Sequence, residues 1–188
     1  VRDIILWGNL LGHPTVNSIF FGGGTPSLLT SKQLETILLT IQGSFDCTAT
    51  TEVTAEINPD DVTAIKIDGF LIAGVNRLSI GFQSLDQGLL RLLSRRHGVD
   101  KAIEAMEIAR SVGVNNINLD LMYGVPTQSL SQFQETLERV VNLQPEHISA
   151  YGLTVETGTP LERLINSAQL PDPDPDLAAD MYAHIDSY

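Results

Sequence analysis

Two carboxylates stand in runs where the strands of an α/β protein normally carry apolar side chains on both faces. In TEVTAEINP (residues 51–59), Thr54, Glu56 and Asn58 share one face, because successive side chains of a strand point to opposite sides. In NINLDLM (residues 116–122), Asn118 and Asp120 share a face in the same way. An unpaired buried carboxylate costs several kcal/mol, so the pattern favours a polar lumen in which these acids are paired, hydrated or bound to a ligand.

A run of three glycines, in FFGGGTPSL at residues 20–28, follows an apolar segment. Glycine loses more backbone entropy on ordering than any other residue, so the run needs a reason. Taken alone, it predicts a tight turn rather than a ligand site. The ends of the five expected strands, however, all carry glycine or polar residues: GGGTP, EINP, GFQS, DLMYGVP and YGLTVETGTP. Sites in parallel α/β folds form at these carboxyl ends, so one shared site is expected.

Structural roles are alternatives for several of these residues. Glu56 could cap neighbouring backbone amides, and Asp120 could pair with Arg95 or Arg96. The lone Cys47 lies in a polar segment and is interpreted as incidental. The histidines lack the spacing of metal ligands and are interpreted as surface or core residues: His13, His97, His147 and His184.

The elements that must position these groups alternate between strands and helices. Strands are predicted at residues 18–22, 52–58, 77–83, 117–123 and 147–154, with helical spacing of apolar residues between them. Recurrence of a strand about every 30 residues with an intervening helix predicts βαβ units and a parallel sheet. A doubly wound sheet and a barrel are both compatible with this pattern. A full eight-stranded barrel needs about 250 residues, so a barrel here is incomplete or smaller.

Helix starts carry clear signals. Residues 30–33 and 129–132 fit the capping-box pattern, and Asp174 before Pro175 predicts an N-cap followed by proline. The segment LPDPDPDLAAD is interpreted as a solvated acidic linker that leads into a last helix. We therefore expect a core domain at residues 1–170 and a proline-rich linker with the start of a further helix at 171–188.

Composition limits the classes of partner. The chain of 188 residues is 43% hydrophobic and 18% charged, with a formal net charge of −12. This field repels phosphate backbones and anionic headgroups, so nucleic acid and membrane surfaces are not expected partners. One cysteine excludes an internal disulfide framework and favours a cytoplasmic setting. The N-terminus resembles an amphipathic helix rather than a signal peptide, and no apolar run reaches the length of a membrane span.

The ordered motifs identify a family. FFGGGTPSLL, AEINPDDV, GVNRLSIGFQSLD, LLSRRH, NINLDLMYGVPTQS and ISAYGLTVETGTPL together resemble the radical S-adenosylmethionine (SAM) enzymes of the oxygen-independent coproporphyrinogen oxidase type. Within that group, GFQS and YGLTVETGTPL are most similar to the HemW-type heme chaperones. The resemblance covers the whole chain and implies a partial (β/α)6 TIM-like barrel that lacks its first strand.

The same resemblance implies that SAM lies across the strand tips. The positions that match the family's ligand contacts are Gly23, Gly24, Thr25, Glu56, Gln83, Arg95, Asp120 and Thr154. The glycine-rich strip approaches the methionine end, and Glu56 is an acidic contact. Gln83, Arg95 and Asp120 match polar contacts that serve a second ligand molecule in the oxidase branch, whereas Thr154 differs from the small residue expected there. Bare glycine backbone, an arginine fork and a carboxylate suit the amino-acid end and hydroxyls of SAM.

The sequence departs from the family pattern in one respect: it does not contain the family's CxxxCxxC motif. Three thiolates of that motif hold a [4Fe–4S] cluster, and Cys47 alone cannot replace them. The chain is therefore expected to be a fragment without the cluster ligands or the family's C-terminal domain, and to be inactive alone. No catalytic residue and no metal ligand is assigned.

Three functions remain open for the parent protein. It is expected to be a heme chaperone that binds SAM, a [4Fe–4S] cluster and heme, with a heme-receiving protein as partner. The alternative is an oxygen-independent coproporphyrinogen III oxidase that decarboxylates a porphyrinogen. A cluster-free, nucleoside-binding barrel fragment is the third, and whether the parent is an enzyme is left open.

Overall fold

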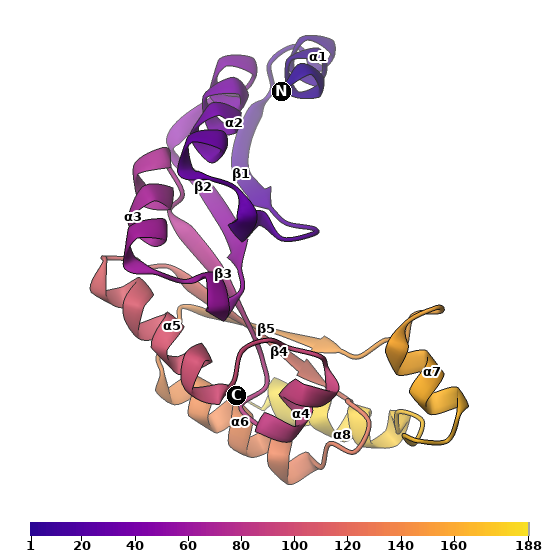
Figure 1. Cartoon of the computed structure of the whole chain (residues 1–188). Coiled ribbons are helices and arrows are strands. Elements are labelled where there is room, and N and C mark those ends of the chain that lie inside the picture. Colours follow the sequence, from indigo (N-terminus) through magenta and orange to yellow (C-terminus); the bar gives the residue numbers. More distant parts are fainter. Residues whose placement is uncertain (188) are drawn as a thin grey trace.

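A curved sheet of parallel strands forms the centre of the protein (Figure 1). The computed structural model describes residues 1–187. Within them, five strands lie in sequential order: β1 Thr15–Phe21, β2 Asp46–Ile57, β3 Arg77–Gln83, β4 Ile117–Tyr123 and β5 His147–Gly152. Each neighbouring pair is parallel, as the βαβ pattern predicts. β1 and β5 form the two edges of this sheet, so the predicted partial barrel is confirmed.

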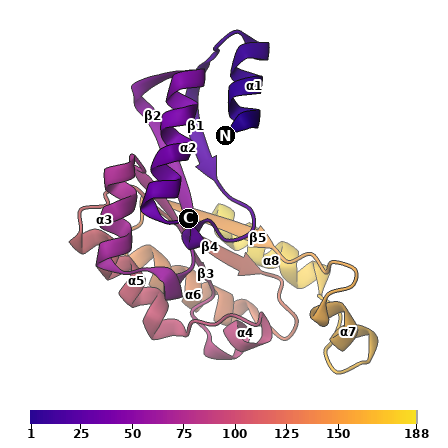
Figure 2. The same cartoon turned by 45° about the horizontal axis from the view of Figure 1, so that its top comes forward.

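Helices cover the convex face of the sheet, and the concave face is open (Figures 1 and 2). The α-helices are α1 Arg2–Leu11, α2 Ser31–Ser44, α3 Ala64–Ala73, α4 Gln87–Leu92, α5 Val99–Ser111, α6 Leu130–Asn142, α7 Pro160–Asn166 and α8 Pro175–Asp186. Two short 3-10 helices, η1 Pro26–Leu28 and η2 Pro59–Asp61, follow β1 and β2. On the convex side α2, α3 and α5 pack in sequence, and α6 contacts α8.

Alternation along the strands separates the core from the open face. Leu78, Ile80 and Phe82 of β3 are buried in the core. On β4, Leu119 and Leu121 belong to the same core. The core is completed on the helix side by Leu34, Leu38, Ile67, Phe70, Ala102, Ala105, Phe133 and Leu137, among others. Ser79, Gly81 and Asp120 alternate with these core residues and face the concave side, and the polar side chains of Ser79 and Asp120 confirm the predicted polar lumen.

The predicted helix starts are confirmed. Both capping boxes are formed: the Thr30 side chain accepts from the Gln33 amide, and the Ser129 side chain accepts from the Gln132 amide. The Asp174 side chain caps α8, which begins at proline. α8 is not an isolated helix, because it packs on α6 and β4 and its Met181 side chain is fully buried.

Strand bounds agree best where strands are buried. β3 and β4 match the predicted ranges, whereas β2 begins six residues earlier than predicted, with the polar run DCTATT. β5 ends at Gly152, so Thr154 follows the strand instead of ending it. The predicted N-terminal helix is α1, which packs on α2 and exposes Trp7 to solvent. Among residues 1–187, no helix has the length and apolarity that a bilayer crossing requires.

Candidate functional site

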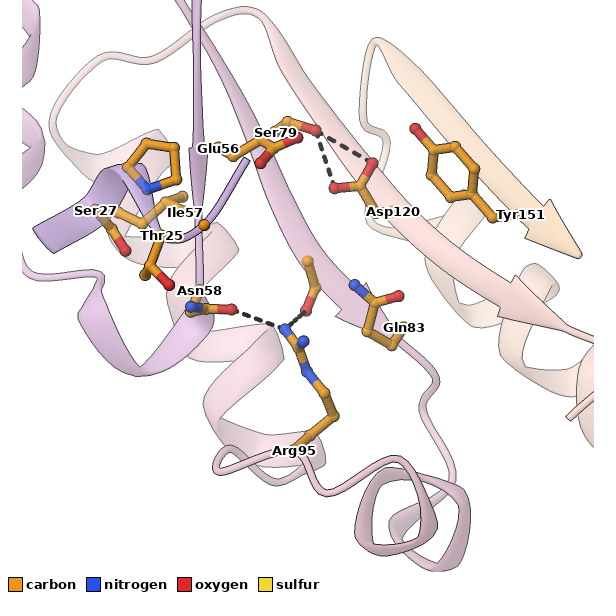
Figure 3. A pocket seen from close by; sticks show the side chains of 13 residues that line it. Thr25, Ser27, Glu56, Ile57, Asn58, Ser79, Gln83, Arg95, Asp120 and Tyr151 are labelled. Carbon is orange, nitrogen blue, oxygen red and sulfur yellow. Dashed lines mark hydrogen bonds between the residues drawn. The ribbon is translucent and has the colours of Figure 1, made fainter. Parts of the chain in front are cut away.

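A cavity of about 260 Å³ lies on the concave face at the carboxyl ends of the strands (Figure 3). It is the geometric result of the parallel topology, which brings these ends to one edge of the sheet. Residues from or just after each of β1 to β5 line it, together with one arginine from the segment after α4. The lining residues are Gly24, Thr25, Pro26, Ser27, Glu56, Ile57, Asn58, Ser79, Gly81, Gln83, Arg95, Asp120 and Tyr151.

The glycine run adopts a backbone that other residues avoid. Gly23 and Gly24 have φ angles of 76° and 62°, in the left-handed region. A Cβ at either residue would meet nothing within 4 Å, so backbone conformation and not crowding explains these glycines. The amide of Gly23 donates to Glu56 Oε2 over 3.3 Å. Glu56 therefore does receive a backbone amide, as its structural alternative proposes, and it also lines the cavity.

The pairing of β3 is irregular near its end, where the Gln83 amide and the Arg95 guanidinium line the cavity. The pairing of β3 with β4 shifts by one residue between Ile80 and Gln83, and Gln83 has a left-handed φ of 67°. Gly81 lies next to both polar side chains. A Cβ there would lie 3.0 Å from Gln83 Nε2 and 3.1 Å from Arg95 Nη2. The absence of a side chain at Gly81 thus lets the Gln83 amide and the Arg95 guanidinium both lie close to this residue.

Arg95 is half-buried and is held by two acceptors. Its Nη2 group donates to Asn58 Oδ1 over 2.8 Å and to the Gly81 carbonyl over 3.4 Å (Figure 3). Burial lowers the pKa of Arg95 from its ordinary value, and the Asp60 carboxylate acts in the opposite direction. An arginine titrates so far above neutrality that it stays charged. The cavity therefore contains a fixed cation.

Asp120 is satisfied by neutral donors. Ser79 Oγ lies 3.0 Å from Asp120 Oδ2, and Asn118 Nδ2 lies 2.7 Å from Oδ1. Burial raises the pKa of Asp120 above its ordinary value, the hydrogen bonds oppose this, and the charge of Glu56 adds to it. Within residues 1–187, no hydrogen bond or ion pair joins Asp120 to Arg95 or Arg96, so the alternative pairing is wrong.

A chain of side-chain hydrogen bonds, the inner ladder, crosses the concave face from β2 to β5. Asn118 donates to Ser79 Oγ over 2.7 Å, and its Oδ1 accepts from Ser149 over 3.0 Å and contacts His147 Nδ1. Arg77 donates to Thr54 Oγ1 over 3.3 Å, which joins β3 to β2. Its Nη2 group lies 3.3 Å from His147 Nδ1, and this nitrogen accepts from Arg77 or donates to Asn118 Oδ1, but not both at once. The ladder supports Asp120 from below the cavity.

Not every predicted site residue lies in the cavity. Gly24, Thr25, Glu56, Gln83, Arg95 and Asp120 line it, Gly23 adjoins it through Glu56, and Thr154 is not among the lining residues. The sequence reasoning missed Ser79 and Tyr151. Period two along SIGFQ would have placed Ser79 on the face of Gln83, and Tyr151 shares its face with Ser149.

The donor set of the cavity fits SAM. Bare backbone at the glycine strip, the fixed cation of Arg95 and the acceptors of Glu56 and Asp120 match an amino acid, a sulfonium and a ribose diol. The described residues do not fit a [4Fe–4S] cluster, because no group of three or more metal-binding side chains occurs among residues 1–187. Cys47 lies near the start of β2, at the end of the strand opposite the cavity.

Comparisons with known proteins identify the chain. The model of the radical SAM superfamily matches residues 3–140. The chain is 40% identical over 173 residues to the mitochondrial radical S-adenosyl methionine domain-containing protein 1 of Mus musculus, covering 92% of this chain and 39% of that protein. It is 42% identical over 144 residues to the heme chaperone HemW of Escherichia coli strain K12, covering 77% and 38%. The chain thus spans about two fifths of these relatives, and the mitochondrial relative leaves the compartment a prediction.

A solved structure agrees with the sequence relatives. Coproporphyrinogen III oxidase HemN from Escherichia coli superposes with a TM-score of 0.81 at 28% identity, covering 98% of this chain and 42% of that one. The resemblance predicted from the motifs is therefore confirmed by both kinds of relative. The chain belongs to the radical SAM superfamily.

Proposed function

We propose that this chain forms the SAM-binding half-barrel of a heme chaperone of the HemW type. Membership of the superfamily implies SAM and a [4Fe–4S] cluster as cofactors. Several bacterial relatives named heme chaperone HemW are 36% to 42% identical to the chain. The neighbour named coproporphyrinogen III oxidase is 28% identical. This difference supports the chaperone over the oxidase.

One observation carries the proposal: the strand ends converge on a polar cavity that contains bare backbone, the two carboxylates Glu56 and Asp120, and the Arg95 guanidinium held by Asn58. The Gly23–Thr25 strip would take the amino-acid end of SAM, because nothing lies within 4 Å of the Cβ positions of Gly23 and Gly24 and a ligand can approach their backbone closely. Arg95 would bind a carboxylate, and Glu56 would accept from an ammonium or a hydroxyl. Gln83 and Asp120 would contact the remaining polar groups, and Thr154 would contact the ligand only if the segment after β5 moved inward.

When bound, SAM together with a reduced [4Fe–4S] cluster would supply one-electron radical chemistry. Cys47 cannot hold that cluster, so its ligands would come from outside residues 1–187. The residues described would bind and orient the ligand and stabilise its charges. Heme or a porphyrinogen would be the second ligand, and a heme-receiving protein would be the partner.

The test is a heme titration of the full-length protein alongside a coproporphyrinogen decarboxylation assay. A chaperone binds heme with a stable, saturable absorbance change and leaves the porphyrinogen unconverted. Steady decarboxylation without stable heme binding would reject the chaperone in favour of the oxidase. Failure of the protein to bind SAM, measured by calorimetry, would reject both and leave a cluster-free barrel.

A further inference from the structure

Three loops at the rim of the cavity meet at one carboxylate, Asp61 of η2. Ser27 of η1 is fully buried, and its Oγ donates to Asp61 Oδ2 over 2.6 Å. Arg96, in the segment after α4, donates from NH2 to Asp61 Oδ1 over 3.3 Å. Lys66 of α3 adds a bond of 2.5 Å from Nζ to the Ser27 carbonyl. These contacts join the segments that follow β1, β2 and β3.

Ser27, Asp61 and Arg96 each stand near a proposed ligand contact in the sequence. Ser27 stands two residues after Thr25, at the end of the glycine strip, and Arg96 directly follows Arg95. Asp61 stands five residues after Glu56 on the short segment that also carries Asn58, the acceptor for Arg95. A shift of Asp61 would therefore change the spacing between the glycine strip and the Arg95 guanidinium.

The carboxylate is well held, although it does not line the cavity. Its side chain is 14% exposed, while that of Arg96 is 65% exposed. Burial alone would raise the pKa of Asp61, but the hydrogen bonds from Ser27 and Arg96, together with the charges of Arg96 and Lys66, hold that pKa below its ordinary value. Arg96 Nε also lies 3.6 Å from the buried Asp60 Oδ2, so two carboxylates hold the Arg96 guanidinium.

We propose that Asp61 is a positioning residue for the amino-acid end of SAM. It touches no ligand; it sets the distance between the glycine strip and Arg95 by holding Ser27 and Arg96 together. The inference rests on the proposed function of the cavity. It deepens that function by assigning recognition of the amino-acid end to the spacing of two loops.

The experiment uses the full-length protein loaded with its cluster and titrates two ligands by calorimetry. SAM contains the amino-acid end, and 5′-methylthioadenosine lacks it. In Asp61→Asn the affinity for SAM falls about fivefold or more, while that for methylthioadenosine stays within about twofold, because two loops move apart only at the amino-acid end. A merely structural role would change both affinities equally or neither.

Glu146→Gln is the matched control. Glu146 also holds an arginine, Arg110, at 2.8 Å and accepts from the Ile117 amide at 2.8 Å, but at the amino ends of the strands. The control loses one charge and thermal stability as Asp61→Asn does, and it keeps the wild-type ratio of the two affinities. A change of that ratio in the control equal to that in Asp61→Asn would overturn the inference.

Arg96→Gln carries the test if Asp61→Asn does not fold, since Arg96 is exposed. It lowers the affinity for SAM in the same selective way, by a smaller factor. An unchanged ratio in a folded variant that binds SAM overturns the inference and leaves the proposed function intact. A wild-type protein that binds methylthioadenosine but not SAM removes both.

Discussion

The convex and concave faces of the sheet are stabilised by different interactions. The convex face is regular: apolar side chains alternate along β3 and β4 and pack fully buried against helices. The concave face has left-handed residues, a register shift and polar groups joined by side-chain hydrogen bonds. Because the apolar face supplies most of the stability, the polar face can keep a cavity lined by charged side chains. Substitutions on the two faces should therefore separate stability from binding.

The largest expected effect lies on the convex face, in Leu119→Ala. Leu119 is fully buried between Asn118 and Asp120 in sequence, but it faces the helices. The truncation removes apolar contacts and leaves a cavity, which lowers the free energy of unfolding by about 2–5 kcal/mol. Denaturant unfolding of the chain measures this. A loss below about 1 kcal/mol would mean that the convex face does not dominate stability.

Glu56→Ala tests the concave face. Loss of the carboxylate weakens SAM binding to the full-length protein by at least about 1 kcal/mol, or about fivefold, the scale of one charged hydrogen bond. Calorimetry gives the dissociation constant, and denaturant unfolding serves as the control, because Glu56 lies outside the core. An unchanged dissociation constant would assign Glu56 the structural role of accepting from the Gly23 amide.

Gly81→Ala sharpens the comparison at the register shift. The added methyl would press on Gln83 and Arg95, whose side-chain atoms lie at 3.0 and 3.1 Å from its position, and SAM binding should fall by about threefold to tenfold. Gly43→Ala in α2 is the matched control, because nothing lies within 4 Å of its Cβ position. There alanine should stabilise the helix by about 0.5–1 kcal/mol without an effect on binding. Equal behaviour of the two variants would contradict the crowding argument.

The smallest effect concerns pH. The folded pKa of Asp120 is raised by burial, so ionising it costs stability as pH rises from its unfolded value through its folded value. Asp120→Asn removes that cost. The variant should match the wild type at low pH and become the more stable protein as pH approaches neutrality, while it binds SAM more weakly. Thermal unfolding of both proteins across this pH range measures the difference in their stability. A variant whose stability falls relative to the wild type as pH rises would refute the prediction.

Burial decided how much of the fold the sequence could predict. β3 and β4 were predicted with their bounds because apolar residues fill one face of each strand. The start of β2 was missed, since DCTATT is polar and pairs only with the edge strand β1. The end of β5 was predicted two residues too late, which is why Thr154 was expected at a strand tip. Edge strands lack the pattern that both faces of a buried strand impose.

The candidate site was predictable in part. Period two and the motifs led to the glycine strip, Glu56 and Asp120, and the structure brings them to one cavity. The left-handed backbone at Gln83 could not be predicted, because only the packing around it sustains a conformation that glutamine avoids. Asp61 carries no sequence signal, since its role depends on contacts with residues 34 and 35 positions away.

The inner ladder has a mechanical consequence. Flattening a curved plate stretches its concave surface, and the bonds of Asn118 to Ser79 and to Ser149 run across that surface from strand to strand. These hydrogen bonds join neighbouring strands and would have to lengthen or break before the sheet could become flat. The half-barrel thus resists bending on its open side through polar hydrogen bonds, where none of the helices in residues 1–187 packs against it.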